Sequence, residues 1–261
     1  MEQKEALFDN AAQSYDDQFT HSEIGKYQRQ RVYYWIDKLG LIDEVQSVFE
    51  INCGTGVDAQ LLKDENIHVT ATDGSPEMIA YAKSKQSKDI DFFVLDFKDL
   101  DDNWINSDLL FSNFGGLNCL DQQGLKNVVN TSAKHQNKGA YLVWVMMPKF
   151  CMMESLYLLT KFRFKSLFRR NTKKGVLVDV EGTAVKTFYH SPREVKKMLA
   201  TEYSILEIKP VAFFLPPSYL EPFFQKRRKT LKFLNHLERY FGRFSLLSSY
   251  ADHYIIIAVK K

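Results

Sequence analysis

Short apolar segments alternate with amphipathic segments over roughly the first 150 residues. The apolar segments predict five strands: Gln46–Ile51, His68–Thr72, Asp91–Leu95, Leu109–Asn113 and Ala140–Met147. The amphipathic segments between them include the expected helices Val57–Asp64, Ser75–Lys85 and Gln122–His135. Strands that alternate with helices in this way predict a parallel sheet with right-handed crossovers. The strands are nearly continuous apolar runs, as expected when helices cover both faces of a sheet.

Outside this region the pattern changes. The segment before the first strand looks helical, including Gly25–Leu39. The later expected elements are a helix over 148–170, a hairpin formed by Gly175–Val180 and Thr183–Tyr189, a helix after Ser191-Pro192, and two strands at Ile205–Phe214 and His253–Val259. Residues 216–250 between those two strands begin with proline and are aromatic and basic.

We expect a single α/β domain over residues 1–261. Its expected parts are an N-terminal helical cap at 1–44, a core at 45–147, a lid insertion at 148–190 after the fifth strand, and a C-terminal part at 191–261 with a basic helical insertion. The lid is rich in apolar residues such as Met152, Met153 and Leu156. Flexible apolar side chains of this kind suit a bulky apolar or aromatic ligand, or a plain core.

Composition narrows the class of protein. With 45% apolar and 26% charged residues, the chain is ordinary for a globular protein. No apolar run approaches the roughly 18–20 residues that span a bilayer, and the charged start of the chain has no signal-type core. Three distant cysteines, Cys53, Cys119 and Cys151, favour free thiols in a reducing compartment. We therefore expect a cytoplasmic protein that does not span a membrane and has no metal site.

Charge is distributed unevenly along the chain. Residues 1–147 carry a net charge of −10 and residues 148–261 carry +13. The basic residues gather in two stretches: Lys161, Arg163, Lys165, Arg169, Arg170, Lys173 and Lys174, and then Lys226, Arg227, Arg228, Lys229 and Lys232. They predict either solvated helix faces or a surface for an anionic partner. The stretches contain no recognisable nucleic-acid module, which disfavours nucleic acid as the partner.

A glycine-containing turn follows the first strand. Gly54 and Gly56 sit between this strand and the next helix, where glycine allows positive φ and a close approach of a ligand. The string Gly54-x-Gly56-x-x-Ala59, with Asp73 near the expected distance, also satisfies the dinucleotide fingerprint. The loop alone therefore leaves a nicotinamide-dependent oxidoreductase open.

Three further features favour S-adenosylmethionine as the ligand. Glu50 lies on the strand before the glycines, a helical prefix precedes that strand, and Asp96 ends the third strand. The strings Glu50-x-Asn52-Cys53-Gly54-Thr55-Gly56, Ala71-Thr72-Asp73-Gly74-Ser75-Pro76-Glu77-Met78 and Leu95-Asp96-Phe97 together resemble the class I methyltransferase family. The resemblance implies a Rossmann-like, seven-stranded, mostly parallel sheet with an antiparallel C-terminal strand.

The resemblance also implies a set of cofactor-binding residues. Gly54 and Gly56 would pass under the methionine portion, Asp73 would bind the ribose, and Asp96 with Phe97 would address the adenine. Glu50 would order the loop and reach the amino group through water. The full expected set is Tyr15, Glu50, Asn52, Cys53, Gly54, Thr55, Gly56, Asp73, Gly74, Met78, Asp96, Phe97, Ser112 and Asn113. Asn52 departs from the family, which usually has glycine there, but asparagine tolerates a left-handed backbone.

The methyl acceptor is expected beyond the fourth strand. Asn113 offers hydrogen bonds at the tip of that strand, and His190 could take a proton from a hydroxyl nucleophile. The alternative for His190 is a loop or capping role. The implied reaction is an in-line methyl transfer that leaves S-adenosylhomocysteine. We expect a small apolar or aromatic acceptor, which is free, carried by an acidic protein or held at an anionic membrane surface. A non-catalytic relative that keeps the cofactor pocket remains a further alternative.

Overall fold

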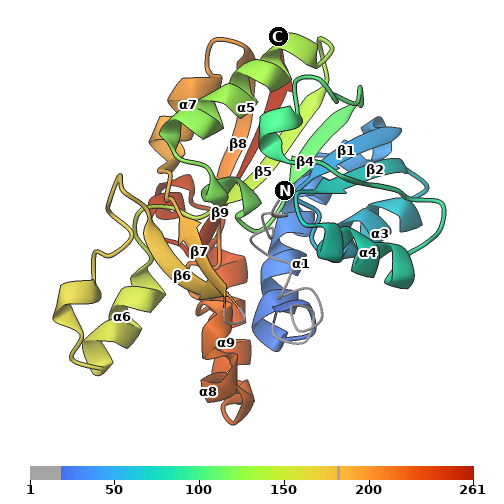
Figure 1. Ribbon diagram of the computed structural model, residues 1–261. Helices are drawn as coiled ribbons and strands as arrows, with labels where there is room; N and C mark the ends of the chain where they lie inside the picture. The colour runs from blue at the N-terminus through green and yellow to red at the C-terminus, as the bar shows by residue number, and fades with distance from the viewer. Residues whose placement is uncertain (1–18, 181–182) are drawn as a thin grey trace.

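The computed structural model describes residues 19–180 and 183–261, so Tyr15 lies outside the described residues. A seven-stranded sheet forms the centre of the molecule (Figure 1). Its strands are β1 Ser47–Ile51, β2 His68–Asp73, β3 Asp91–Val94, β4 Leu109–Ser112, β5 Tyr141–Met146, β8 Tyr203–Val211 and β9 His253–Lys260. Their order across the sheet is β3-β2-β1-β4-β5-β9-β8.

The direction of the strands matches the expectation from the sequence. β1 pairs in parallel with β2 and β4, whereas β9 pairs antiparallel with both β5 and β8. The strand order therefore reverses between β1 and β4, and this reversal places a crevice at their carboxyl ends. The mostly parallel sheet with an antiparallel C-terminal strand is confirmed.

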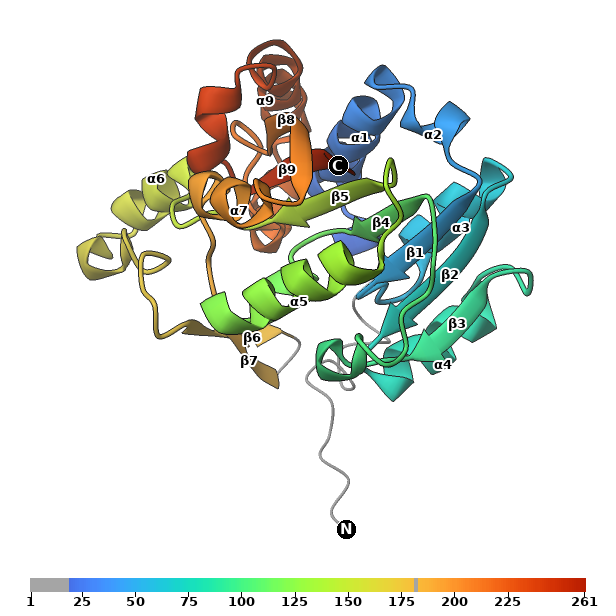
Figure 2. The same ribbon diagram turned by 90° about the horizontal axis from the view of Figure 1, so that it is seen from above.

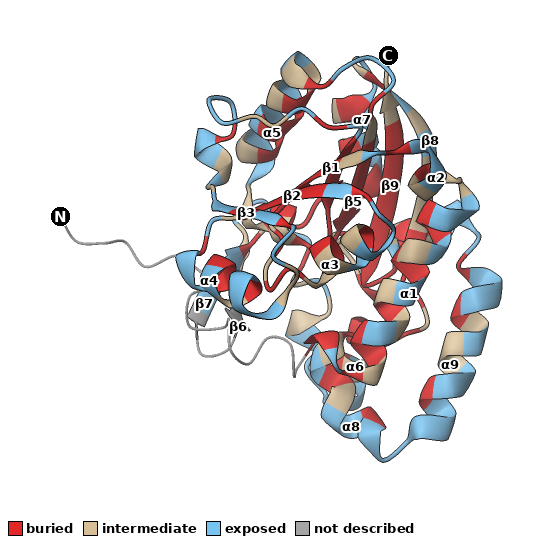
Figure 3. Cartoon of the chain, turned by 90° about the vertical axis from the view of Figure 1, so that its right-hand side faces the viewer, coloured by how far each residue is buried: buried red, intermediate tan, exposed pale blue. Residues whose placement is uncertain are grey.

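Helices cover both faces of the sheet (Figure 2). On one face, α1 Glu23–Lys38, α3 Val57–Asp64 and α4 Pro76–Lys85 pack through Trp35, Leu62 and Ile79. On the other face, α5 Gln122–His135 and α7 Pro192–Leu199 pack through Val128 and Val195. Buried side chains fill the strands between these two layers (Figure 3). The short helix α2, Leu41–Glu44, leads into β1.

Local sequence signals set several helix boundaries. Ser75 caps α4 by accepting a hydrogen bond from the backbone N–H of Met78, and Pro76 takes the first helical position. Ser191 and Glu194 form a reciprocal capping box at the start of α7. Hydroxyl caps followed by proline therefore fix where these helices begin.

The region after β5 differs in part from the expectation. The hairpin is present as β6 Val176–Val180 and β7 Thr183–Thr187, but the helix expected over 148–170 is wrong in length. Helix α6 spans only Met152–Thr160, and a short 3-10 turn follows at Phe164–Ser166. The helix ends because Phe162 adopts a left-handed backbone with φ of 55°.

Two other details depart from the expected pattern. β3 is an edge strand whose Phe93 and Val94 are exposed, so helices do not cover both sides of every strand. The stretch 216–250 folds into α8 Glu221–Gln225 and α9 Arg228–Phe241, which pack on α1 through Ile24, Phe224 and Leu231. Within residues 19–180 and 183–261, none of the helices is long and apolar enough to cross a membrane.

Candidate cofactor site

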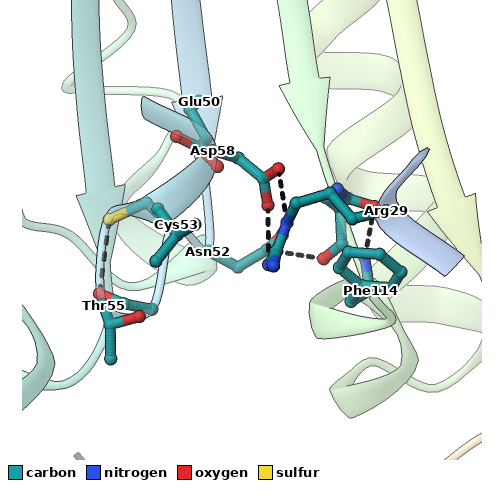
Figure 4. Close-up of a pocket in the computed structure, with 10 residues that line it drawn as sticks. Arg29, Glu50, Asn52, Cys53, Thr55, Asp58 and Phe114 are labelled. Carbon is teal, nitrogen blue, oxygen red and sulfur yellow. Dashed lines mark hydrogen bonds and ion pairs between the residues drawn. The ribbon is translucent and has the colours of Figure 1, made fainter. Parts of the chain in front are cut away.

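A hollow of about 320 Å³, partly open to solvent, lies at the carboxyl ends of β1 and β4 (Figure 4). The loop after β1, the first turn of α3, the loop after β4 and helix α1 surround it. The residues that line it are Arg29, Glu50, Asn52, Cys53, Gly54, Thr55, Val57, Asp58, Asn113 and Phe114. Six of these, Glu50 and Asn52 to Thr55 with Asn113, were expected from the sequence to bind a cofactor.

The glycine loop has the backbone that its sequence predicts. Asn52, Gly54 and Gly56 all have positive φ, at 58°, 55° and 75°. A Cβ atom on Gly56 would lie 2.8 Å from the ring of Phe92, so only glycine allows the loop to pass this close to β3. The carboxylate of Asp73 accepts hydrogen bonds from the backbone N–H groups of Gly54 and Ser75, each at 2.9 Å. Asp73 thus fixes the loop from the neighbouring strand.

Asn52 connects the tips of β1 and β4 across the crevice. Its Oδ1 accepts a hydrogen bond from the Ser112 hydroxyl at 2.6 Å, and its Nδ2 donates to the carbonyl of Asn113 at 3.1 Å. A Cβ atom on Gly116 would lie 2.3 Å from the Asn52 side chain. The asparagine side chain therefore occupies space at the switch point that a glycine would leave open.

Two carboxyl groups and a guanidinium meet in the hollow. Glu50 on β1 is almost fully buried, and burial followed by the nearby Asp58 raises its pKa well above the usual value. Asp58 accepts hydrogen bonds from Nε and Nη2 of Arg29, at 3.0 and 3.4 Å. The guanidinium of Arg29 also lies over the ring of Phe114, 5.1 Å from its centroid. Figure 4 shows Arg29 reaching from α1 toward Asp58.

Two buried polar atoms in this hollow lack partners. Within the described part of the chain, neither Oε2 of Glu50 nor Nδ2 of Asn113 makes a hydrogen bond. A buried polar atom without a partner is costly, and a ligand can remove that cost. The hollow thus offers an acidic acceptor, an amide donor and the Arg29 cation, which together suit a ligand with both an ammonium and a carboxylate group.

The expected adenine-side residues lie along the next strands, outside the residues that line the hollow. Asp96 caps the 3-10 turn Phe97–Asp99 by accepting from the backbone N–H of Lys98 at 3.0 Å. A Cβ on Gly74 would lie 3.9 Å from the Cα of Asp96, so the ends of β2 and β3 are adjacent there. Met78 is buried in the first turn of α4, and Phe97 is half-buried.

His190 lies away from the hollow. Its Nε2 is 2.9 Å from the carbonyl oxygen of Leu120, and its backbone N–H donates to the carbonyl of Met147. Burial lowers the pKa of its imidazole. These contacts tie the start of α7 to the loop after β4 and to the end of β5.

Sequence reasoning did not identify Arg29 and Asp58. The spacing of Gly25, Arg29, Val32 and Ile36 places Arg29 on the inward stripe of α1, where a charged side chain needs a buried partner. An arginine at an inward position of an amphipathic helix is the signal that could have revealed it. Asp58 is the matching acid in the first turn of α3.

All three cysteines are free and shielded from solvent to different degrees. Cys53 and Cys151 are buried, and Cys119 is partly buried. Burial raises the pKa of Cys53 well above its usual value, and it raises the pKa of Cys119 and of Cys151 to about 12. At neutral pH each thiol is therefore protonated.

Comparisons with known proteins agree with this geometry. Residues 48–139 match a family model described as a methyltransferase domain. No curated protein matches the chain. A protein from Pyrococcus horikoshii has a TM-score of 0.57 at 15% identity, covering 95% of this chain and 99% of its own. Magnesium protoporphyrin IX methyltransferase from Synechocystis, with bound S-adenosylhomocysteine, has a TM-score of 0.57 at 16% identity, covering 91% and 85%. A methyltransferase from Archaeoglobus fulgidus has a TM-score of 0.53 at 15% identity, covering 95% and 98%.

Proposed function

We propose that the chain is a class I methyltransferase that uses S-adenosylmethionine, and that it methylates a small apolar or aromatic molecule. The observation that carries the proposal is the hollow at the β1–β4 switch point. There, an oxygen of Glu50 and the Nδ2 of Asn113, both without a partner among the described residues, converge with the Arg29 cation beside the glycine loop. This donor set fits the amino-acid end of the cofactor.

We assign the cofactor contacts residue by residue. Glu50 accepts from the ammonium group, and Arg29 faces the carboxylate. Gly54 and Gly56 leave room for the methionine chain. The remaining expected contacts lie around or beyond these groups: Asn52, Cys53 and Thr55 in the loop, Asp73 and Gly74 at the ribose, Met78, Asp96 and Phe97 at the adenine, Ser112 and Asn113 at the tip of β4, and Tyr15 in the N-terminal segment. Ionised carboxylates suit the hydroxyl and amino groups that the ligand presents.

The bound cofactor supplies a sulfonium methyl group, which a nucleophile attacks in line with the departing sulfur. The protein contributes mainly alignment and exclusion of water. Asn113 is the polar group at the tip of β4 that lies nearest the expected position of the acceptor. If the acceptor must lose a proton, His190 is the expected base: its Nε2 donates to the carbonyl of Leu120, which leaves Nδ1 as the basic nitrogen, although the residue does not line the hollow.

Two features support an apolar acceptor. Phe114 follows Asn113 directly and presents an aromatic ring to the hollow. The residues after β5 contribute further apolar side chains, including the half-buried Met147 and Phe150. One protein of the same fold is named for an acceptor with a large aromatic ring system, magnesium protoporphyrin IX.

Calorimetric titration of the purified protein with S-adenosylhomocysteine and with NADH tests the proposed cofactor. We expect saturable binding of S-adenosylhomocysteine and none of NADH. Asp73→Asn removes one carboxylate oxygen that faces the ribose and the loop, and it should weaken S-adenosylhomocysteine binding at least tenfold, because a charge-assisted hydrogen bond is stronger than a neutral one.

Asp43→Asn, in α2 and outside the hollow, serves as the matched control and should leave the affinity unchanged. Tight NADH binding would contradict the proposed cofactor. An Asp73→Asn variant that folds normally and binds S-adenosylhomocysteine as tightly as the unaltered protein would remove the ribose assignment.

A further inference from the structure

A run of alternating basic and aromatic residues projects from the end of α6. Lys161, Phe162, Arg163, Phe164 and Lys165 are all exposed, with Phe162 at 81% and Phe164 at 58%. We call residues 161–165 the basic aromatic turn. Phe168, three residues beyond it, is 67% exposed. Single exposed apolar residues are common on protein surfaces, but three phenylalanines in seven residues are not.

The backbone shows that Phe162 occupies a position that favours glycine. Helix α6 ends in a Schellman motif: the backbone N–H of Arg163 donates to the carbonyl of Leu158, and that of Phe162 donates to the carbonyl of Leu159. Phe162 is the left-handed residue of this motif, with φ of 55°. A bulky side chain there is disfavoured, and the exposed ring gains little burial in return. An exposed ring at a strained position therefore points to a contact outside the chain.

The charge around the turn is entirely positive. No acidic residue occurs between Ser155 and Val178. Two of the basic residues in this stretch are used inside the molecule, because Arg169 and Arg170 pair with Glu154, and Arg170 also pairs with Asp252. The exposed basic groups that remain are those of the turn, Lys161, Arg163 and Lys165, together with Lys173 and Lys174.

A second projection of the same character lies on α8 and α9. Phe223 is exposed with the Arg227 guanidinium 3.9 Å from its ring centroid, and α9 exposes Phe233 beside Lys229 and Lys232. Figures 1 and 3 show α6, α8 and α9 at one end of the molecule. The two projections are joined through Tyr157 of α6, which packs against the apolar cluster that includes Phe224 of α8 and Leu231 of α9.

We propose that this end of the molecule docks on an anionic lipid bilayer, with the phenylalanines inserted at the headgroup level and the basic side chains on lipid phosphates. Rings that protrude next to cations suit a bilayer interface, which accepts them without a matching shape. A folded acidic protein would instead need pockets for three protruding rings. The anionic headgroups complement the net positive charge of the turn.

Docking in this orientation would bring the cofactor hollow close to the lipid. Ile24 and Tyr27 of α1 pack with the α8–α9 projection, and Arg29 of the same helix lines the hollow. The bilayer would then present an apolar acceptor at the site. This last step rests on the proposed function, whereas the docking itself does not.

Co-sedimentation of the full chain with vesicles tests the docking. We expect binding to phosphatidylcholine vesicles that contain phosphatidylserine, much weaker binding to pure phosphatidylcholine, and loss of binding at high salt. Replacing Lys161, Arg163 and Lys165 together by glutamine should weaken binding about 100-fold. The matched control replaces Lys83 and Lys85 at the end of α4 and Lys88 in the turn after it, and should bind as the unaltered protein does.

Phe162→Gly separates docking from folding. Glycine suits the left-handed position, so the melting temperature should stay the same or rise, while vesicle binding falls about tenfold because one buried ring is lost. Absence of vesicle binding, full binding by Phe162→Gly, equal loss in the control variant, or preferential binding of polyglutamate would each overturn the docking. Calorimetry with S-adenosylhomocysteine on the same samples keeps this outcome distinct from failure of the proposed function.

Discussion

Asn52 holds a strained backbone and uses its side chain to offset the strain. A non-glycine residue in the left-handed region costs roughly 1–2 kcal/mol, less for asparagine than for most residues. The two hydrogen bonds that Asn52 makes to the tip of β4 each stabilise the fold by about 1 kcal/mol. The sequence alone predicted that asparagine would tolerate this backbone, but not that it would bridge the crevice, because Ser112 and Asn113 lie 60 residues away along the chain.

Substitutions at Asn52 and at Asn66 separate the cost of the left-handed backbone from the contribution of the two hydrogen bonds. Asn66 also has positive φ, at 63°, and is exposed. Asn66→Gly should be neutral or slightly stabilising, because only strain is removed. Asn52→Gly should destabilise by about 1 kcal/mol and Asn52→Ala by about 2–3 kcal/mol, because both lose the bridge and alanine adds strain. Urea unfolding gives these differences, and equal effects of glycine at the two positions would contradict the bridging role.

Glu50 should make cofactor binding depend on pH. Its raised pKa means that the free protein favours the protonated form, whereas a ligand ammonium favours the ionised form. Binding then releases a proton, so affinity for S-adenosylhomocysteine should increase as pH rises toward the raised pKa, by at most about tenfold per pH unit, and level off above it. In Glu50→Gln the increase should disappear. Calorimetry between pH 5.5 and 8 in buffers of different ionisation enthalpy measures both the affinity and the released proton.

Glu50→Gln should also change the stability of the fold, and here the substitution should be favourable at neutral pH. A carboxyl whose pKa is higher in the folded state destabilises the fold as pH rises from its unfolded to its folded pKa. Glu50→Gln should therefore be more stable than the unaltered protein at neutral pH and not at acidic pH. A variant that is less stable at every pH would show that Glu50 serves the fold rather than a ligand.

At the scale of elements, α6 is fixed to the sheet by a buried ion-pair network. Glu154 of α6 pairs with Arg170, which also donates to Asp252 just before β9, with both contacts at 2.8 Å. Burial alone would raise the pKa of Asp252, but His253 and Arg170 hold it below its usual value. Sequence reasoning placed Arg169 and Arg170 in a basic surface stretch, because nothing in local composition shows that two neighbouring arginines turn inward. The insertion is therefore anchored by charges rather than by apolar packing alone.

Removing Arg170 should be much more harmful than removing an exposed arginine. Arg170→Leu leaves Asp252 buried without its guanidinium partner, which typically costs 3–5 kcal/mol. Arg193→Leu on the exposed side of α7 should stay within about 0.5 kcal/mol. Thermal unfolding of both variants checks the difference, and a small effect of Arg170→Leu would show that the network contributes little.

At the scale of the whole molecule, the sheet was largely predictable and the site only in part. Apolar periodicity located all seven strands within a few residues, because buried strands need such patterns. The glycine loop and Glu50 predicted where the hollow lies, whereas the assignment of a cofactor to it stays a prediction. Arg29, Asp58 and the end of α6 were missed, because each depends on contacts between distant segments or on a single left-handed residue. The division into cap, core, lid and C-terminal part stays a prediction.

A ligand bound in the crevice should stabilise the whole molecule, because it would contact both halves of the sheet, at the ends of β1 and β4, and also helix α1. S-adenosylhomocysteine at 100 times its dissociation constant should add about 2.7 kcal/mol, and raise the melting temperature by roughly 5–10 °C. NADH at the same concentration should have no effect. Differential scanning fluorimetry measures both shifts, and a shift with NADH alone would contradict the proposed cofactor.

The three protonated thiols make the natural protein inert toward alkylating reagents at neutral pH, since the thiolate is the reactive form. A cysteine introduced at an exposed position would then react alone, without removal of the native ones. A fluorophore attached in this way could follow movements of single segments in an otherwise unaltered sequence. Alkylation of Cys53 would also detect local unfolding, because unfolding of the glycine loop would expose a thiol that is unreactive in the folded protein.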